Sequence, residues 1–178
     1  MSKAKFVDWR KVKPSPLILV FGSEEYLFSS AIRRIKDQIR HSEDSVEIYE
    51  IEASDYVGGD LQNMVSPSLF SEPKLVIITG VERCTDALIE DGKTLDVSEL
   101  VDVSIVFQHS GTSTRGKALL ESIRGNEKAV EVACAKLTKD TEKVSFVQAH
   151  FTEANRKFTQ SAVKALVEAF GNNLLELA

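Results

Sequence analysis

The stretch Leu17-Ile18-Leu19-Val20-Phe21-Gly22-Ser23-Glu24-Glu25-Tyr26-Leu27 decides the fold class of this chain. Its five consecutive apolar residues, 17–21, end at Gly22, a pattern typical of a strand buried on both faces of a sheet. After the turn, apolar residues recur at helical spacing at Phe28, Ile32, Ile35 and Ile39. The stretch therefore predicts a buried strand, a tight turn and an amphipathic helix.

The following hundred residues repeat this alternation of strand and helix. Further strands are predicted at 46–51, 74–79, 103–107 and 129–132. Helices are predicted at 61–65, at 117–123, and at 85–100 with an interruption at Gly92. Strands that alternate with helices at this spacing form right-handed crossovers. We therefore expect an α/β fold, with a parallel five-stranded sheet and helices on both of its faces.

The pattern changes after Cys134. From Asp140 onward we find no strand pattern, and two helical stripes of apolar residues follow one another up to Phe170. This predicts a separate helical unit. A final apolar turn at 174–177 has no predicted element to pack against, which indicates that the sequence is a fragment of a longer protein.

Composition excludes several classes of protein. The 178 residues carry 22 Lys and Arg against 27 Asp and Glu, and 43% are hydrophobic, as in ordinary globular proteins. The net charge of −5 disfavours holding nucleic acid through the overall field, although a local basic patch is compatible with it. Two cysteines outside any CxxC spacing argue against a disulfide scaffold and a structural zinc site. Without a membrane-spanning run or a secretory signal, we expect a cytoplasmic protein with no membrane association.

The turn after the first buried strand is where a phosphate-binding loop would lie. Aligning Gly22 with the first glycine of GxxxxGK[ST] places Leu27 at the second glycine and Phe28 at the lysine, and only Ser29 agrees. The strand 74–79 also lacks the terminal acid that holds magnesium. We therefore predict a degenerate nucleotide loop, no catalytic residue, no cofactor and no metal site.

Two basic groups have a functional and a simpler interpretation. Arg33, Arg34, Lys36 and Arg40 lie on the polar face of the first helix, and Arg115 and Lys117 lie in a polar loop near Gly111 and Gly116. Either group is placed where it would meet phosphates. A solvated helix face is the simpler interpretation of the first group, because acidic residues are abundant elsewhere and no aromatic residue interleaves it.

The segment Ser66-Pro67-Ser68-Leu69-Phe70 places two large apolar residues next to each other in polar, proline-containing surroundings. Such a pair is suited to anchor a partner, because a few buried apolar side chains carry most of the binding energy of an interface. Pattern alone favours the alternative that both residues close over the sheet as ordinary core.

The sequence resembles the δ subunits of the bacterial DNA polymerase III clamp loader. The likeness rests on the stretch 17–27, on Ser68-Leu69-Phe70 shortly before a buried strand, and on the helical tail. In that tail, the matching residues run from Lys157-Phe158-Thr159-Gln160 to Gly171-Asn172-Asn173-Leu174. The resemblance covers nearly the whole chain and reverses the preference at Leu69 and Phe70.

The resemblance implies a RecA-like or AAA+-like domain of P-loop type at residues 1–133 that has lost its nucleotide site. The start of a small, all-helical lid domain would follow at 134–178, and the C-terminal collar domain would be absent. As a noncatalytic part of the DNA polymerase III holoenzyme, a nucleotidyltransferase complex, the protein would act at replication forks in the nucleoid.

The partners implied by the resemblance are the β sliding clamp, the γ/τ and δ′ subunits of the loader, and DNA through the assembled complex. Leu69 and Phe70, together with Ser68 and Pro67, would bind a hydrophobic pocket on the clamp and favour opening of its ring. Two alternatives stay open: a nucleotide-binding regulator with a degenerate loop, and a plain protein-interaction domain.

Overall fold

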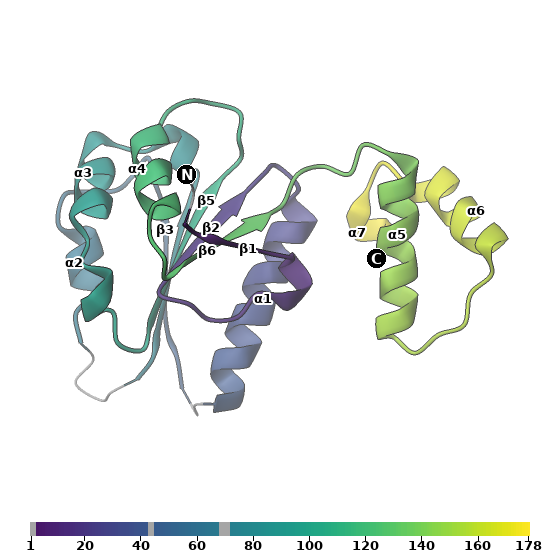
Figure 1. Ribbon diagram of the computed structural model, residues 1–178, viewed down its shortest axis with the longest axis horizontal. Coiled ribbons are helices and arrows are strands. Elements are labelled where there is room, and N and C mark those ends of the chain that lie inside the picture. The colour runs from purple at the N-terminus through teal and green to yellow at the C-terminus, as the bar shows by residue number, and fades with distance from the viewer. Residues whose placement is uncertain (1–2, 43–44, 68–71) are drawn as a thin grey trace. The chain divides into compact units, whose positions relative to one another are not determined.

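The computed structural model describes residues 3–42, 45–67 and 72–178 (Figure 1). The chain divides into two compact units, Met1–Ala135 and Lys136–Ala178. No helix within the described ranges is long and apolar enough to cross a membrane.

The first unit is an α/β domain built on one parallel sheet. Within the described residues the sheet has six strands in the order β1-β6-β2-β5-β4-β3. Their bounds are Lys5–Val7 (β1), Leu17–Phe21 (β2), Glu47–Glu52 (β3), Lys74–Thr79 (β4), Val103–His109 (β5) and Ala129–Ala133 (β6). Each neighbouring pair of strands is parallel.

The prediction of five strands is therefore wrong by one strand, β1. This strand has only three residues, and it lies at the edge of the sheet beside β6. Phe6, its central residue, is 67% exposed. A short, exposed edge strand carries neither a buried apolar run nor a long alternation, so the sequence pattern does not reveal it.

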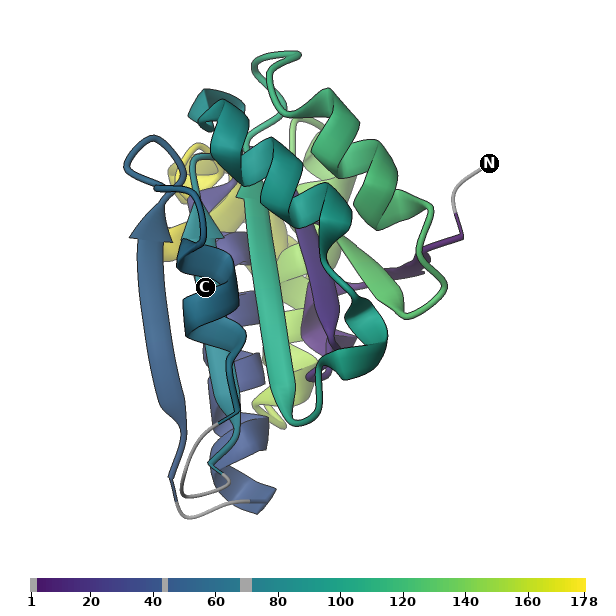
Figure 2. The same ribbon diagram turned by 90° about the vertical axis from the view of Figure 1, so that its left-hand side faces the viewer.

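Helices cover both faces of the sheet, as predicted (Figures 1 and 2). One face carries α1 (Glu25–Ser42), with the short 3-10 turn η1 (Trp9–Lys11) packed beside it. The other face carries α2 (Asp60–Val65), α3 (Asp86–Thr94) and α4 (Lys117–Arg124). Two further 3-10 turns are η2 (Val81–Arg83) and η3 (Val97–Glu99).

The core lies on both sides of β2, which explains its uninterrupted apolar sequence. Leu17 and Leu19 belong to one buried cluster with residues of α2, α3 and α4, such as Leu61 and Leu119. Because side chains alternate along a strand, Ile18 and Val20 point to the opposite face, that of α1, and both are fully buried.

Helix α3 differs from its prediction because it continues through Gly92 to Thr94. A Cβ atom at Gly92 would stand 2.5 Å from Leu119 Cδ1 of α4. The missing side chain therefore allows the two helices to pack closely, and tertiary packing outweighs the low helix propensity of glycine.

The second unit contains α5 (Asp140–Glu153), α6 (Gln160–Phe170) and α7 (Leu174–Leu177). Phe146 and Val147 of α5, and Val163 and Val167 of α6, are buried. The expectation that the last apolar turn has nothing to pack against is wrong, because α7 contacts α6 and buries Leu174 and Leu177. These two residues thus complete the apolar interior of the unit.

Candidate functional site

The topology of the sheet singles out the carboxyl end of β2. This strand lies between β5 and β6, and the chain leaving it forms α1 on one face, whereas the chain leaving β5 forms α4 on the other. Ligands of open parallel sheets bind outside the carboxyl ends of the strands, at such a switch in direction. The residues that follow β2 are therefore the first place to examine for a binding site.

The backbone after β2 is bonded to its neighbouring strands. The Gly22 N–H donates to His109 O at 2.9 Å, and the Glu24 N–H donates to Cys134 O at 2.8 Å. Gly22 has a φ of +136°, and a Cβ atom there would stand 2.2 Å from the carbonyl carbon of Cys134. Two N–H groups at the position of a phosphate loop are thus already used within the fold.

Side chains at the positions of the degenerate loop are likewise used in packing within the fold. Leu27 is only 3% exposed and belongs to the core. Phe28 is half-buried and Ser29 is exposed on α1. The structure therefore places Gly22 in the turn, as predicted, and uses Leu27 to pack α1 onto the sheet.

Phe21, the last residue of β2, belongs to a stack of rings and charges. Its ring stacks on His109 with the centroids 5.5 Å apart, and the Arg124 guanidinium lies 4.9 Å from the Phe21 centroid. Arg124 donates two hydrogen bonds to Glu131, of 2.8 and 2.5 Å. Glu131 is 4% exposed, so the half-buried Arg124 beside the Phe21 ring is held by a buried carboxylate of β6.

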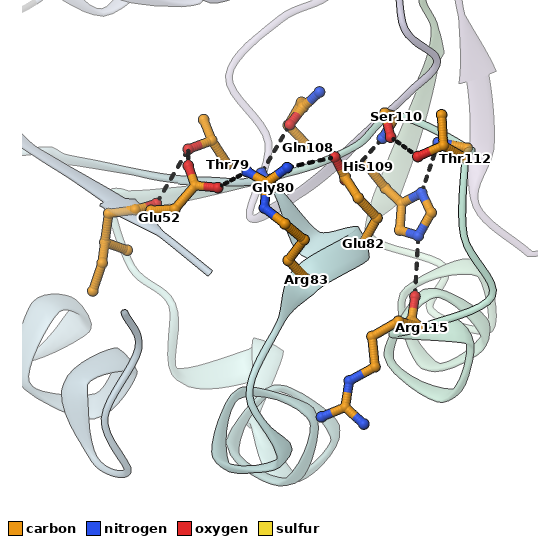
Figure 3. Close-up of polar contacts among 12 residues, drawn as sticks. Glu52, Thr79, Gly80, Glu82, Arg83, Gln108, His109, Ser110, Thr112 and Arg115 are labelled. Carbon is orange, nitrogen blue, oxygen red and sulfur yellow. Dashed lines mark hydrogen bonds and ion pairs between the residues drawn. The ribbon is translucent and has the colours of Figure 1, made fainter. Parts of the chain in front are cut away.

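Polar side chains connect the carboxyl ends of β3, β4 and β5 (Figure 3). Glu52 accepts hydrogen bonds from Thr79 Oγ1, at 2.8 Å, and from the Arg83 guanidinium. The Gly80 N–H donates to Gln108 Oε1 at 2.9 Å. These contacts fix η2 against the ends of the strands.

His109 organises the loop between β5 and α4. Its Nδ1 accepts from the Gly111 N–H at 2.9 Å, so Nε2 carries the proton and donates to Arg115 O at 3.1 Å. The Ser110 N–H donates to Glu82 Oε2 at 3.1 Å. Burial raises the pKa of the Glu82 carboxyl, but its hydrogen bonds from Ser110 help to outweigh burial and hold the net pKa below the usual value.

Arg115 has structural partners at the place where a phosphate contact was considered. Its Nε donates to Cys84 O at 2.9 Å, and its Nη2 donates to Asp86 Oδ1 at 2.6 Å. The described residues hold no group of three or more His, Cys, Asp or Glu that could bind a metal ion. The polar edge is therefore bonded within itself and holds the loops in place.

The candidate anchor segment, residues 66–73, joins α2 to β4. Ser68, Leu69 and Phe70 lie outside the described residues, while Pro67 is described and exposed. On the α2 side, Ser66 Oγ donates to Gln62 O at 2.7 Å.

On the β4 side, the anchor segment is bonded to the start of β3 and the residues before it. Glu72 accepts a 2.7 Å hydrogen bond from Ser45 Oγ, and the Pro73 carbonyl accepts a 2.9 Å bond from the Glu47 N–H. Lys74 is 6% exposed, and its Nζ lies 3.1 Å from Glu47 Oε2. Both ends of the anchor segment are therefore fixed on the α/β unit.

The start of α2 is fixed by residues that the sequence analysis did not single out. The Tyr56 hydroxyl donates to Asp91 Oδ2 of α3 at 2.7 Å and accepts from the Leu61 N–H at 2.9 Å. The Gly59 N–H donates to the same Asp91 oxygen at 2.8 Å. The one available signal is a lone aromatic residue, Tyr56, in a turn-like stretch of small and acidic residues.

Comparison with known proteins adds no relative. No protein-family model matches the chain, and no curated protein matches it.

Proposed function

We propose that this chain is the clamp-binding part of a δ-type subunit of a bacterial clamp loader. Residues 1–133 would form its RecA-like or AAA+-like domain, and residues 134–178 the start of its lid. It would bind the ring-shaped sliding clamp and favour the open ring for loading onto primed DNA. The observation that carries the proposal is the anchor segment, which holds the Leu69-Phe70 pair between two fixed ends.

Fixed ends favour binding by such a pair. A free loop loses conformational entropy when a partner immobilises it, and a segment held at both ends loses less. Ser66 is bonded to α2 on one side, and Pro73 is bonded to β3 on the other. One leucine and one phenylalanine supply the kind of apolar anchors that dominate interface energies.

The position of α2 also supports this role. Its first turn is bonded to α3 through Tyr56 and Asp91. Leu61, a residue of this turn, is fully buried. Motion at the start of the helix would displace the segment that follows its end. The bonds at Tyr56 therefore serve the positioning of the anchor segment.

The closed backbone after β2 supports a noncatalytic role. Gly22 and Glu24 direct their N–H groups to His109 and Cys134 rather than to a ligand. These two bonds, among the residues that the structure describes, disfavour the alternative of a nucleotide-binding regulator. A nucleotide that binds the folded chain would stabilise it by about 2.7 kcal/mol when its free concentration is about 100 times its Kd. Thermal unfolding with and without MgATP therefore tests that alternative directly.

No covalent step is needed for clamp opening. A partner that binds the open ring more tightly than the closed ring shifts the population toward the open ring by the ratio of the two affinities. In the complete loader, the γ/τ and δ′ subunits would govern access to the anchor segment. The protein would then act in the cytoplasm at replication forks, as part of the DNA polymerase III holoenzyme.

Release of a bacterial sliding clamp from nicked circular plasmid tests opening, because a closed ring cannot leave circular DNA, which has no end. We expect the chain to accelerate release and the Leu69→Ala/Phe70→Ala variant to lose this effect. The matched control is Phe170→Ala/Leu175→Ala, which removes the same two residue types from exposed positions of the second unit. Equal loss in both variants, or no release by the wild-type chain, would overturn the proposal.

A further inference from the structure

Charge is divided sharply along the first unit. Residues 1–42 contain nine Lys and Arg against four Asp and Glu, whereas residues 43–135 contain seven against 18. The first group forms β1, η1, β2 and α1, and the second includes α2, α3 and α4 on the opposite face of the sheet. Although the net charge of the whole chain is negative, the side of the sheet that carries α1 is therefore basic.

Five exposed cations form this basic face, which we define as Lys11, Lys13, Arg33, Arg34 and Arg40. Among the residues that the structure describes, none forms an ion pair with these five. Two nearby cations are excluded because they are paired: Lys36 with Glu50 at 2.7 Å, and Arg10 with Asp8 at 3.0 Å. Two exposed acids, Glu25 in the first turn and Asp37, lie on the same helix.

The basic face is held on a rigid element. Arg33 and Arg40 are seven residues apart on α1, which separates them by about two turns, or roughly 10 Å. Gln38 Nε2 donates to Val12 O at 2.8 Å, so the stretch that carries Lys11 and Lys13 lies against the same helix. Ile35, on the inner side of α1, is fully buried and fixes the helix on the sheet. The cations therefore form a fixed array.

The chemistry of this array fits nucleic acid better than protein. Within the described residues the large exposed apolar side chains are Phe6, Val57, Val101, Phe170 and Leu175, and none lies on η1 or α1. A protein partner is usually held by buried apolar and aromatic anchors. Interfaces with nucleic acid are more polar and far more positively charged, as this face is.

The two aromatic residues nearby point to a duplex rather than a single strand. Trp9 and Tyr26 pack edge to face, with ring centroids 6.2 Å apart, and the Arg10 guanidinium lies over Trp9. Proteins that bind single strands stack the bases on open aromatic faces. Two half-buried rings that pack edge to face, one of them covered by a guanidinium, do not provide that platform, so charge is left to hold the ligand.

We propose that the basic face binds the phosphate backbone of duplex nucleic acid without reading its sequence. The simpler interpretation as a solvated helix face rested on acids that are abundant elsewhere, and only four of the 22 acids in residues 1–135 fall in the stretch 1–42 that carries this face. This inference goes beyond clamp binding and does not depend on it.

The test is fluorescence anisotropy of a labelled DNA duplex titrated with the chain at several salt concentrations. Each neutralised phosphate contributes about −0.9 to the slope of log K against log salt. We expect the Arg33→Glu/Arg34→Glu variant to bind at least about tenfold more weakly at low salt, with a slope shallower by about two. The milder Arg33→Gln/Arg34→Gln variant should show the same change of slope and guards against misfolding.

The matched control is Arg156→Glu/Lys157→Glu, an adjacent exposed pair in the second unit with the same change of charge. It should bind the duplex within about threefold of the wild-type chain. Equal losses in both glutamate variants, or an unchanged slope at Arg33 and Arg34, would overturn the proposal. Tighter binding of an unpaired strand, or equal competition by polyglutamate, would also overturn it.

Discussion

The Tyr56 hydroxyl donates a 2.7 Å hydrogen bond to Asp91 Oδ2, so two residues 35 positions apart join the start of α2 to α3. The same hydroxyl accepts from the Leu61 N–H, and Tyr56 is only 3% exposed. One buried oxygen therefore satisfies a helix N–H and a carboxylate together. This junction holds the helix that leads into the anchor segment.

Replacing Tyr56 by Phe should lower the free energy of unfolding by about 1 to 3 kcal/mol, because the Leu61 N–H is left without its partner in a buried place. Urea denaturation measures this change. The Asp91→Asn variant should lose less, since its amide oxygen still accepts from Tyr56 and Gly59. A Tyr56→Phe variant as stable as the wild-type chain would show that the hydroxyl does not support α2.

Tyr56 also predicts how stability depends on alkaline pH. Burial, together with the Asp91 carboxylate, raises the pKa of Tyr56 above its ordinary value of 10.0. Above pH 10 the unfolded chain releases this proton while the folded chain keeps it, so stability falls as pH rises, by up to about 1.4 kcal/mol per pH unit. The Tyr56→Phe variant should lack this contribution, and parallel pH profiles of the two proteins would refute it.

Arg124 and Glu131 predict an unequal response to truncation. Arg124→Ala should destabilise the protein by about 3 kcal/mol, because it strands a carboxylate that is 4% exposed. Glu131→Ala should cost less, since the Arg124 side chain is 31% exposed and still reaches water. Chemical denaturation of both variants tests the order, and a larger loss in Glu131→Ala would contradict it.

Gly22 and Gly59 provide a matched pair for the turn after β2. Both have a positive φ, but a Cβ atom at Gly22 would collide with the backbone of Cys134, whereas at Gly59 nothing lies within 4 Å. Gly22→Ala should therefore cost at least about 3 kcal/mol, and Gly59→Ala only about 1. Similar thermal shifts in the two variants would mean that the turn has room for a larger group.

The buried strands could be predicted from the sequence because burial leaves continuous apolar runs. Residues 17–21 and 74–79 form strands with the predicted ends. The edge strand Lys5–Val7 lacks such a run, and the continuation of α3 through Gly92 depends on its packing with Leu119 of α4. Local pattern does not contain either relation.

The candidate site could be predicted only in part, because many of its contacts join residues that are far apart in the sequence. Gly22 and Leu27 were found from their spacing, and the absence of a lysine at Phe28 is visible in the sequence itself. Contacts such as Glu52 with Arg83, or Tyr56 with Asp91, join residues more than 30 positions apart. The prediction for Leu69 and Phe70 falls on residues outside the described part of the chain and stays a prediction.

The most direct test of the central claim is calorimetric titration of a purified bacterial sliding clamp with this chain. We predict saturable binding that the Leu69→Ala/Phe70→Ala variant loses and the Phe170→Ala/Leu175→Ala control keeps. A well-folded chain that releases no heat of binding, or a Leu69→Ala/Phe70→Ala variant that binds like the wild-type chain, would contradict the account.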